Sequence, residues 1–328
     1  MSNISDSTVS YDDLDRLDRR ILHELDLDST VPLSQISKRL RIGSDLVEYR
    51  VKRFRDLGII MRFTPVINPA KLGLQIFKTY IKHRMSKSVY RNWIKRASAT
   101  PSTYWLTEGY GQWDVLLSLA AKTTAEYQEA IDELLADVGE DIIDVSVFPL
   151  VSVDRFPKHY LVGSGHEGVE WRSSGPAAEV DELERRLLQL LSENCRLPDT
   201  ELAAALETSS AIVRYRKQKL EQSGVILAYR TQLDYAKLGM VVVKVFIQPK
   251  RFSQPVRDKL LAYCRKEPRI TCFVQQLGSY PIELEAELQR YHDLPRLLEG
   301  FWGEFGEAVS RMEYMILTKD YYHRIPEG

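Results

Sequence analysis

The sequence has little of what marks secreted, metal-binding or membrane proteins. Its three cysteines, Cys195, Cys264 and Cys272, form no CxxC pair, which favours buried thiols in a reducing cytosol over a disulfide framework or a zinc site. No apolar run approaches the ~18 residues of a membrane-spanning helix, and the polar start has no signal-peptide core. No phosphate-binding loop, nucleophile elbow or metal-ligand spacing is present either. We therefore expect a cytoplasmic protein with no membrane contact, no metal, no cofactor and no catalytic residue.

A surplus of charge of either sign is also missing. The net charge is −1 and the isoelectric point is near 6.6, which argues against a generally basic nucleic-acid coat. Any nucleic-acid binding must then come from a local patch. The composition, 44% hydrophobic and 28% charged, is that of a globular protein, and 328 residues suit two to four compact domains.

One stretch of the chain occurs twice. Residues 44–73, SDLVEYRVKRFRDLGIIMRFTPVINPAKLG, return 166 positions later as SAIVRYRKQKLEQSGVILAYRTQLDYAKLG. At this offset Leu17–Lys82 pairs with Leu183–Gln248 without a gap, and 19 of the 66 pairs are identical. Such self-similarity indicates one structural unit that is used twice.

The first unit begins with three predicted helices. Apolar residues recur at helical spacing in 12–26 and 33–40, and a third helix runs from Ser44 until Gly58 ends it. A three-residue turn, 41–43, precedes the third helix, which is typical of a helix-turn-helix whose last helix enters the DNA major groove. The alternative is a small helical bundle that binds protein.

Basic residues concentrate in this first unit. Between Leu33 and Arg62 eight basic residues stand against three acidic ones, whereas between Asp199 and Ala228 four stand against four. Because such a surplus attracts phosphates, the first unit should dominate DNA binding, and the two unlike helices should favour an asymmetric site. We predict base contacts from the outward face of the third helix, and phosphate contacts around it: Ser44, Asp45, Glu48, Tyr49 and Lys52 for bases, and Lys38, Arg39, Arg53 and Arg55 for phosphates. Arg50 is either a further contact or a structural arginine held by a carboxylate or carbonyl. The second unit offers Ser210, Ala211, Arg214, Tyr215, Gln218 and Lys219.

After Phe63 the hydrophobic period changes from 3.6 to 2. The pattern predicts strands at 74–82, 103–108, 112–121 and 142–153 and helices at 86–98 and 124–137, which is the βαββαβ order of a ferredoxin-like layer. We expect the sheet face without helices to carry Phe77, Val115 or Leu117. Such a face must meet another sheet, so the two copies should pair as a pseudo-dimer within one chain, with larger homo-oligomers also expected.

The predicted fold class is α+β, with two repeats of a winged-type helix-turn-helix domain followed by a ferredoxin-like domain. Residues 163–178 are rich in Gly and Ser and have no period, so we expect a flexible tether there. The expected domains are 12–62 and 180–228 for the helix-turn-helix units, 63–162 and 229–328 for the ferredoxin-like units, and 163–179 for the linker.

The repeated stretch resembles the Lrp/AsnC ("feast/famine") transcription regulators. The Arg, the Gly before an Ile/Val pair and the closing KLG, present at EYRVKRFRDLGIIMRFTPVINPAKLG and again in the second copy, match that family's signature. The resemblance covers nearly the whole chain twice. It implies a cytoplasmic, nucleoid-associated regulator that binds double-stranded DNA and responds to a small metabolite such as an amino acid.

The resemblance also implies an effector site at one turn. The stretch Gly109, Tyr110, Gly111, Gln112, Trp113, Asp114 is similar to the glycine, aromatic and Asp turn that family members place beside a small-molecule pocket. In the second unit the turn is Gly278-Ser279-Tyr280-Pro281, where Pro281 replaces Asp114. Because proline offers no side-chain acceptor, we expect the first turn to be the better site, with Gly278 marking a weaker one.

Two other functions stay open. Siroheme decarboxylases have this domain order and can be fused in pairs, and the family uses a histidine for acid/base chemistry at the turn between the second and third strands. Here Thr107–Trp113 has no histidine. A ligand-free architectural protein or co-regulator is the other alternative. Glu283 and Glu285 invite a catalytic interpretation, but alternating charge on an exposed strand face is the more ordinary explanation.

Overall fold

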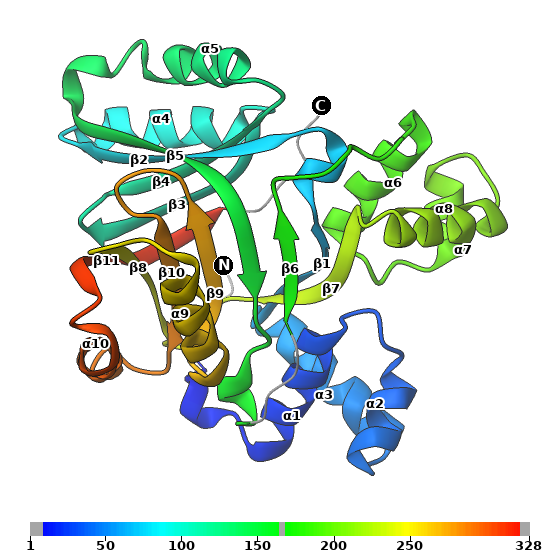
Figure 1. Cartoon of the computed structure of the whole chain (residues 1–328). Coiled ribbons are helices and arrows are strands. Elements are labelled where there is room, and N and C mark those ends of the chain that lie inside the picture. Colours follow the sequence, from blue (N-terminus) through cyan, green and yellow to red (C-terminus); the bar gives the residue numbers. More distant parts are fainter. Residues whose placement is uncertain (1–8, 164–167, 322–328) are drawn as a thin grey trace.

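The computed structural model describes residues 9–163 and 168–321 (Figure 1). Two helix-turn-helix units lie on one side of a larger body of strands and helices. The first unit contains α1 (Arg16–Leu27), α2 (Leu33–Leu40) and α3 (Ser44–Asp56), and the second contains α6 (Glu182–Glu193), α7 (Asp199–Ala205) and α8 (Ser210–Gln222). A capping box starts α1 at Asp15 and α6 at Asp181, the same position of the repeat.

A two-stranded ribbon joins the two helix-turn-helix units. Strand β1 (Ile60–Ile67) follows α3, strand β7 (Ile226–Leu233) follows α8, and the two pair antiparallel. Equivalent bonds flank the ribbon: Ser29 N donates to Tyr229 O at 3.1 Å, and Cys195 N donates to Phe63 O at 2.9 Å. Ser29 and Cys195 are equivalent positions of the repeat, and the Ser29 Oγ lies 3.2 Å from the Cys195 Sγ. A pseudo-twofold axis therefore passes between these two side chains.

Each unit continues into the predicted βαββαβ order. The first contains β2 (Gln75–His83), α4 (Lys87–Ala99), β3 (Thr103–Gly111), β4 (Val115–Ala121), α5 (Thr124–Leu135) and β5 (Ile142–Arg155). The second contains β8 (Val241–Pro249), α9 (Gln254–Lys266), β9 (Ile270–Gln276), β10 (Ile282–Leu288), α10 (Asp293–Phe305) and β11 (Val309–Tyr321). Short 3₁₀ turns lie at Tyr11–Asp13, Pro69–Leu72, Gly139–Asp141 and His159–Leu161.

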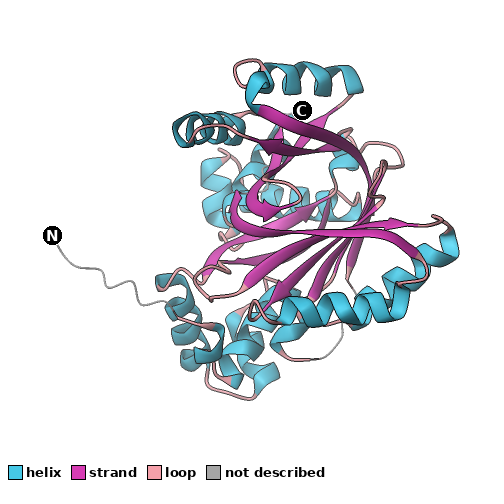
Figure 2. Cartoon of the chain, turned by 90° about the vertical axis from the view of Figure 1, so that its left-hand side faces the viewer, coloured by secondary structure: helices cyan, strands magenta, loops and turns pink. Residues whose placement is uncertain are grey.

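The last strand of each unit crosses to the other unit and closes a barrel. The first half of β5 pairs with β2, and its second half pairs with β9; β11 pairs with β8 and then with β3. The strands therefore follow one another around the barrel in the order β2-β4-β3-β11-β8-β10-β9-β5 and back to β2. Figure 2 shows these strands in the interior, with helices outside them. The prediction of a pseudo-dimer within one chain is confirmed, whereas assembly of several chains stays a prediction that light scattering can check.

One detail of the predicted packing is wrong. Phe77, Val115 and Leu117 do not lie on the face between the two sheets: they pack with Trp93 and Tyr127 under the helices of their own unit. The face between the sheets carries the alternate residues, including Tyr80, Trp105 and Leu116. Both faces of these strands are apolar, so a period of two could not tell them apart.

The predicted linker also contains structure. Strand β6 (Val169–Arg172) pairs with the end of β5, and Trp171 is buried against the ribbon side of the core. The expectation of a flexible tether is therefore wrong for 169–172, and residues 164–167 of the predicted linker lie outside the described residues. All three cysteines are buried, as expected.

Candidate functional site

Helix α3 has the two faces that the sequence predicts. Val47, Val51 and Phe54 are buried against the unit's other helices. The opposite face carries Asp45, Glu48, Tyr49 and Lys52 as exposed side chains and a half-buried Ser44. Tyr49 is 62% exposed, and so large an exposed fraction is unusual for an aromatic side chain.

Helix α8 repeats this arrangement with other chemistry. Val213 and Leu220 are buried, and the outward face carries Ala211, Arg214, Tyr215 and Gln218, with Ser210 half-buried. Tyr215 is 63% exposed and occupies the position of Tyr49. The two helices thus share one exposed tyrosine and differ at most other outward positions.

Some predicted phosphate contacts are held inside their own unit. Arg50 donates to Asp15 and to the buried Asp18, each at 2.6 Å, and Arg53 reaches Asp18 at 3.0 Å. The second unit repeats this network: Arg216 bonds Asp181 and Glu184, and Lys219 bonds Glu184 at 2.9 Å. Arg50 and Lys219 therefore fasten the third helix of each unit to the first, the structural alternative considered for Arg50.

The remaining cations differ between the units. Within the described residues Lys38, Arg41 and Arg55 are exposed and have no ion-pair partner, while Arg39 reaches Glu24 and Lys52 reaches Asp56. In the second unit Arg214 and Lys217 both reach Asp199, so all four of its basic side chains between Asp199 and Ala228 are paired. The charge asymmetry seen in the sequence is thus sharper in the structure.

Replacing Glu207 by arginine is expected to strengthen DNA binding. Glu207 occupies the position of Arg41, and both have left-handed backbone, with φ of 54° and 57°. The substitution therefore adds no backbone strain and turns a repelling charge into an attracting one, which should increase the salt slope of binding by about one. Fluorescence anisotropy with a DNA duplex at several salt concentrations measures this. Glu129→Arg, on the exposed face of α5, is the matched control and should leave the slope unchanged.

Gly109 and Gly111 of the predicted effector turn lie where the backbones of the two units contact each other. A side chain at Gly109 would lie 2.1 Å from the carbonyl oxygen of Ile316, and one at Gly111 would lie 2.4 Å from that of Tyr314. Both carbonyls belong to β11, so the glycines let this strand approach β3 closely. Gln112 N donates to Tyr314 O at 3.2 Å, and Tyr110 is 73% exposed.

Asp114 is already engaged within the turn. Its carboxylate accepts from Lys82 at 2.7 Å and from the His83 amide at 3.1 Å. In the second unit Gln276 N donates to Pro281 O as Gly109 N donates to Asp114 O, so Pro281 does hold the position of Asp114. Gly278, with φ of 125°, packs against Phe148. An effector role for this turn stays a prediction.

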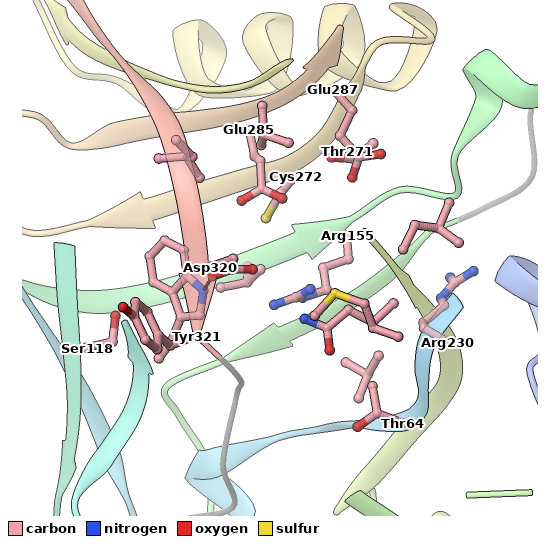
Figure 3. A pocket seen from close by; sticks show the side chains of 18 of the residues that line it. Thr64, Ser118, Arg155, Arg230, Thr271, Cys272, Glu285, Glu287, Asp320 and Tyr321 are labelled. Atoms are coloured by element: carbon pink, nitrogen blue, oxygen red, sulfur yellow. Dashed lines mark hydrogen bonds between the residues drawn. The ribbon is translucent and has the colours of Figure 1, made fainter. Parts of the chain in front are cut away.

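A large cavity lies elsewhere, between the barrel and the β1–β7 ribbon. Its volume is about 650 Å³, and its lining comes from both ribbon strands, from β2, β3, β5, β8, β9 and β10, and from the end of β11. None of Gly109, Gly111 and Asp114 is among the residues that line it. In Figure 3 Arg155 reaches into the middle of this space, with Asp320 on one side and Arg230 on the other.

A buried ionic network forms one wall of the cavity. Lys78 and Lys244, equivalent positions of the repeat, both pair with Glu283, and Lys244 also pairs with Glu285 at 2.8 Å. Glu283 is fully buried, so the expectation of an exposed charged strand is wrong for it. Burial alone would raise the pKa of Glu283, but Lys244 and Lys78 hold it at about 2. The recurrence of the same lysine inside two apolar strands was the sequence signal for this network.

Asp320 faces the cavity from β11. Trp105 Nε1 donates to its carboxylate at 2.5 Å, and the nearby charges come from Glu285, Lys244 and Arg155 on three other strands. Asp320 is an exposed residue that lines this cavity, but the surrounding strands desolvate its carboxylate, and this desolvation, assisted by Glu285, raises its pKa to about 7 against the opposing effects of Trp105, Lys244 and Arg155. Among the described residues the cavity lining contains no histidine, and no cluster of side chains suits a metal ion.

Asp320→Asn is expected to change how stability depends on pH. The folded wild-type protein keeps a proton on Asp320 up to about pH 7, whereas the unfolded chain releases it near its ordinary pKa. Rising pH between these values therefore favours unfolding of the wild type, and the asparagine variant lacks this effect. Thermal unfolding should show the variant gaining stability over wild type from pH 5 to pH 8. A constant difference would contradict the raised pKa.

The two helix-turn-helix units on a closed ferredoxin-like barrel place the chain among two-unit proteins of the DNA-binding helix-turn-helix class. An AsnC-type helix-turn-helix model matches residues 180–221, and a winged helix-turn-helix DNA-binding model matches residues 14–61. An uncharacterized HTH-type transcriptional regulator of Pyrococcus abyssi is 31% identical over 138 residues, which are 40% of this chain and 92% of that protein. The chain belongs to the Lrp/AsnC family of regulators.

Two further comparisons show what each half and the whole resemble. The HTH-type transcriptional regulator FL11 of Pyrococcus furiosus is 29% identical over 119 residues, 36% of this chain and 78% of that protein, so it corresponds in length to about one repeat. The crystal structure of the siroheme decarboxylase NirDL superposes with a TM-score of 0.62 at 14% identity and covers 95% of this chain and 94% of that one. This second likeness concerns the fold. No helix in the described ranges 9–163 and 168–321 has the length and apolar character needed to span a membrane.

Proposed function

We propose that the protein is a sequence-specific transcription regulator that binds double-stranded DNA through α3 and α8. The observation that carries this proposal is the outward face of α3, where Tyr49 and the polar side chains around it are exposed. Lys38, Arg41 and Arg55, which have no ion-pair partner in the described part of the chain, surround them. Exposed polar groups on such a helix suit base edges, and cations beside it suit phosphates. Membership of the Lrp/AsnC family supports the same function.

The bound site should be asymmetric. The outward residues of α3 and α8 differ, and the cations of the second unit are neutralised by their own acids. Two unlike helices related by a pseudo-twofold axis do not read identical half-sites equally well. Selection from random duplexes, with and without an amino-acid mixture, tests this: we expect recovery of a site with one strongly and one weakly specified half. Recovery of no sequence would contradict the proposal, and a palindrome would contradict the asymmetry.

We further propose that an amino-acid-like effector acts at the turn around Asp114. The carboxylate there is partly exposed, at 21% of its side-chain surface, and can accept from an amino group in addition to Lys82. Asp114→Asn should weaken the response of DNA affinity to an amino-acid panel much more than Pro281→Ala does, because Pro281 has no side-chain acceptor. Anisotropy titrations with each amino acid measure both responses. A wild-type response in Asp114→Asn would show that this turn is not the effector site, and equal loss in both variants would show that the two turns act alike.

A siroheme decarboxylase-like enzyme is the second candidate. What favours it is the likeness in fold over 95% of the chain, together with a cavity large enough for a sizeable ligand. The described lining of that cavity has no histidine to supply acid/base chemistry. A tetrapyrrole detected by absorbance or mass in purified protein would favour the enzyme, and its absence after incubation with a soluble tetrapyrrole would exclude that candidate.

A further inference from the structure

We propose that α3 and α8 read opposite kinds of base in DNA: α3 accepts hydrogen bonds from cytosine, whereas α8 donates to guanine and contacts the methyl group of thymine. This inference rests on the proposed function, because it assigns bases to the two helices that carry it. Of the five outward positions, the serine and the tyrosine are the same in both helices, and three differ. The differing pairs are Asp45 with Ala211, Glu48 with Arg214, and Lys52 with Gln218.

Asp45 and Glu48 put two carboxylates on the outward face of α3. Both side chains are exposed and lie one helical turn apart, and neither has an ion-pair partner in the described part of the chain. An acid beside DNA is repelled by the phosphates, and this cost is offset where a base donates a hydrogen bond to it. In the major groove, aspartate and glutamate accept from the amino group of cytosine. We therefore assign cytosine to these two side chains.

The fold of α3 does not require these acids. Asp45 lies in the first turn, where an acid favours a helix, but α8 has Ala211 at that position and reaches the same length of 13 residues. Glu48 lies beyond the first turn, and Arg214 replaces it in α8. A change of charge that leaves the helix intact, on an exposed face, indicates a change in what that face binds.

Arg214 and Ala211 give α8 a donor and a methyl group where α3 has acceptors. The Nε of Arg214 lies 3.5 Å from Asp199 Oδ2, and 67% of the side chain is exposed. A contact through Nε leaves the two terminal nitrogens of the guanidinium to donate elsewhere. Two such donors match O6 and N7 of guanine, the commonest specific contact in the major groove. Ala211, one turn earlier, suits the methyl group of thymine.

The second unit depends on base contacts more than the first unit does. Where the first unit has Lys38, Arg41 and Arg55, the second has Ala204, Glu207 and Glu221, all of them exposed. With two acids and an alanine in place of three cations, phosphate contacts add little to the affinity of this unit. Its half-site is therefore specified mainly through α8 itself.

Exchanging the outward residues of the full-length protein tests the assignment. The variant Asp45→Ala/Glu48→Arg/Lys52→Gln has the α8 residues on both helices. Because the helices are related by a pseudo-twofold axis, selection from random duplexes should then recover an inverted repeat of the half-site that α8 selects in the wild type. The reverse variant, Ala211→Asp/Arg214→Glu/Gln218→Lys, should recover an inverted repeat of the other half.

Changes in the selected duplex identify the bases. Replacing cytosine by thymine in the α3 half should weaken wild-type binding about tenfold, because a donor becomes an acceptor. Replacing thymine by deoxyuridine in the α8 half should weaken it about fourfold, the effect of one methyl group, and the same replacement in the α3 half is the control.

The outcomes separate this inference from the proposed function. If the wild type recovers no sequence, the regulator function fails and the base assignment fails with it. The base assignment alone is wrong if the wild type selects an asymmetric site and an exchange variant with wild-type circular dichroism selects the same site. It is also wrong if the α3 half specifies no C·G pair.

Discussion

Replacing Lys38, Arg41 and Arg55 together by glutamine is expected to abolish most DNA binding. These three cations are exposed, lie around α3 and have no ion-pair partner among the described residues. Each phosphate contact contributes about 0.9 to the slope of log affinity against log salt, so losing three should reduce that slope by roughly 2.7. At low salt this corresponds to an affinity loss of about a hundredfold or more. Fluorescence anisotropy against a selected duplex at several salt concentrations measures both quantities.

The matched control removes the same charge from another surface. Lys87, Lys95 and Lys122 are exposed on the ferredoxin-like domain of the same unit, away from α3 and α8. Their replacement by glutamine changes the net charge equally and should leave the salt slope unchanged. If both triple variants lose affinity to the same extent, the effect comes from overall charge and the first unit has no special role.

The choice of residues for this experiment depends on the structure. Reversing Arg53 or Lys219 would place a carboxylate next to the buried Asp18 or Glu184 and disturb the fold of the unit. The sequence shows that basic residues gather in the first unit, but it cannot show that Arg50 and Arg53 are already neutralised, because their partner Asp18 lies more than 30 positions away on another helix. Lys38, Arg41 and Arg55 are identified only when those pairs are known.

The order of elements could be predicted because local patterns determine it. Helical spacing, the glycine after α3 and α8, and the change to period two identify the helices and strands of both repeats. The repeat itself predicts the pairing of the two units, since an unpaired sheet face is costly in water. The crossing of β5 and β11 between the sheets was not predicted, because it depends on contacts between residues more than 100 positions apart.

The cavity could not be predicted for a related reason. Alternation in β10 shows that Glu283, Glu285 and Glu287 share a face, but an alternating strand does not reveal whether that face meets water or another charged strand. Here it meets Lys78 and Lys244, and these two lysines compensate the buried carboxylates. Asp320 reaches the same space only because β11 continues beyond its own sheet to pair with β3.

Lys244→Met is expected to lower the free energy of unfolding by about 3 to 5 kcal/mol, the range for removing one partner of a buried ion pair. Lys244 is almost fully buried and bonds both Glu283 and Glu285 at 2.8 Å, so its loss removes the ion pair of Glu285 and leaves Glu283 with Lys78 and the Tyr80 hydroxyl. Lys78→Met is the matched variant at the equivalent position of the repeat. It should cost less than half as much, because Glu283 keeps Lys244 and the Tyr80 hydroxyl and Glu285 loses nothing. Urea unfolding of the two variants gives both values.

The pH dependence separates charge from packing in this comparison. Without Lys244 the two buried glutamates should have raised pKa values, so they can take up protons as the pH falls and the cost of burying them then decreases. The difference in stability between wild type and Lys244→Met should therefore shrink from pH 8 to pH 5. A loss caused only by the changed shape of the side chain would be the same at both pH values, since methionine and its apolar neighbours do not titrate. If Lys78→Met and Lys244→Met lower the free energy of unfolding equally at pH 8, the stability of the protein does not depend on the ion pair between Glu285 and Lys244. The two lysines would then contribute equally to stability.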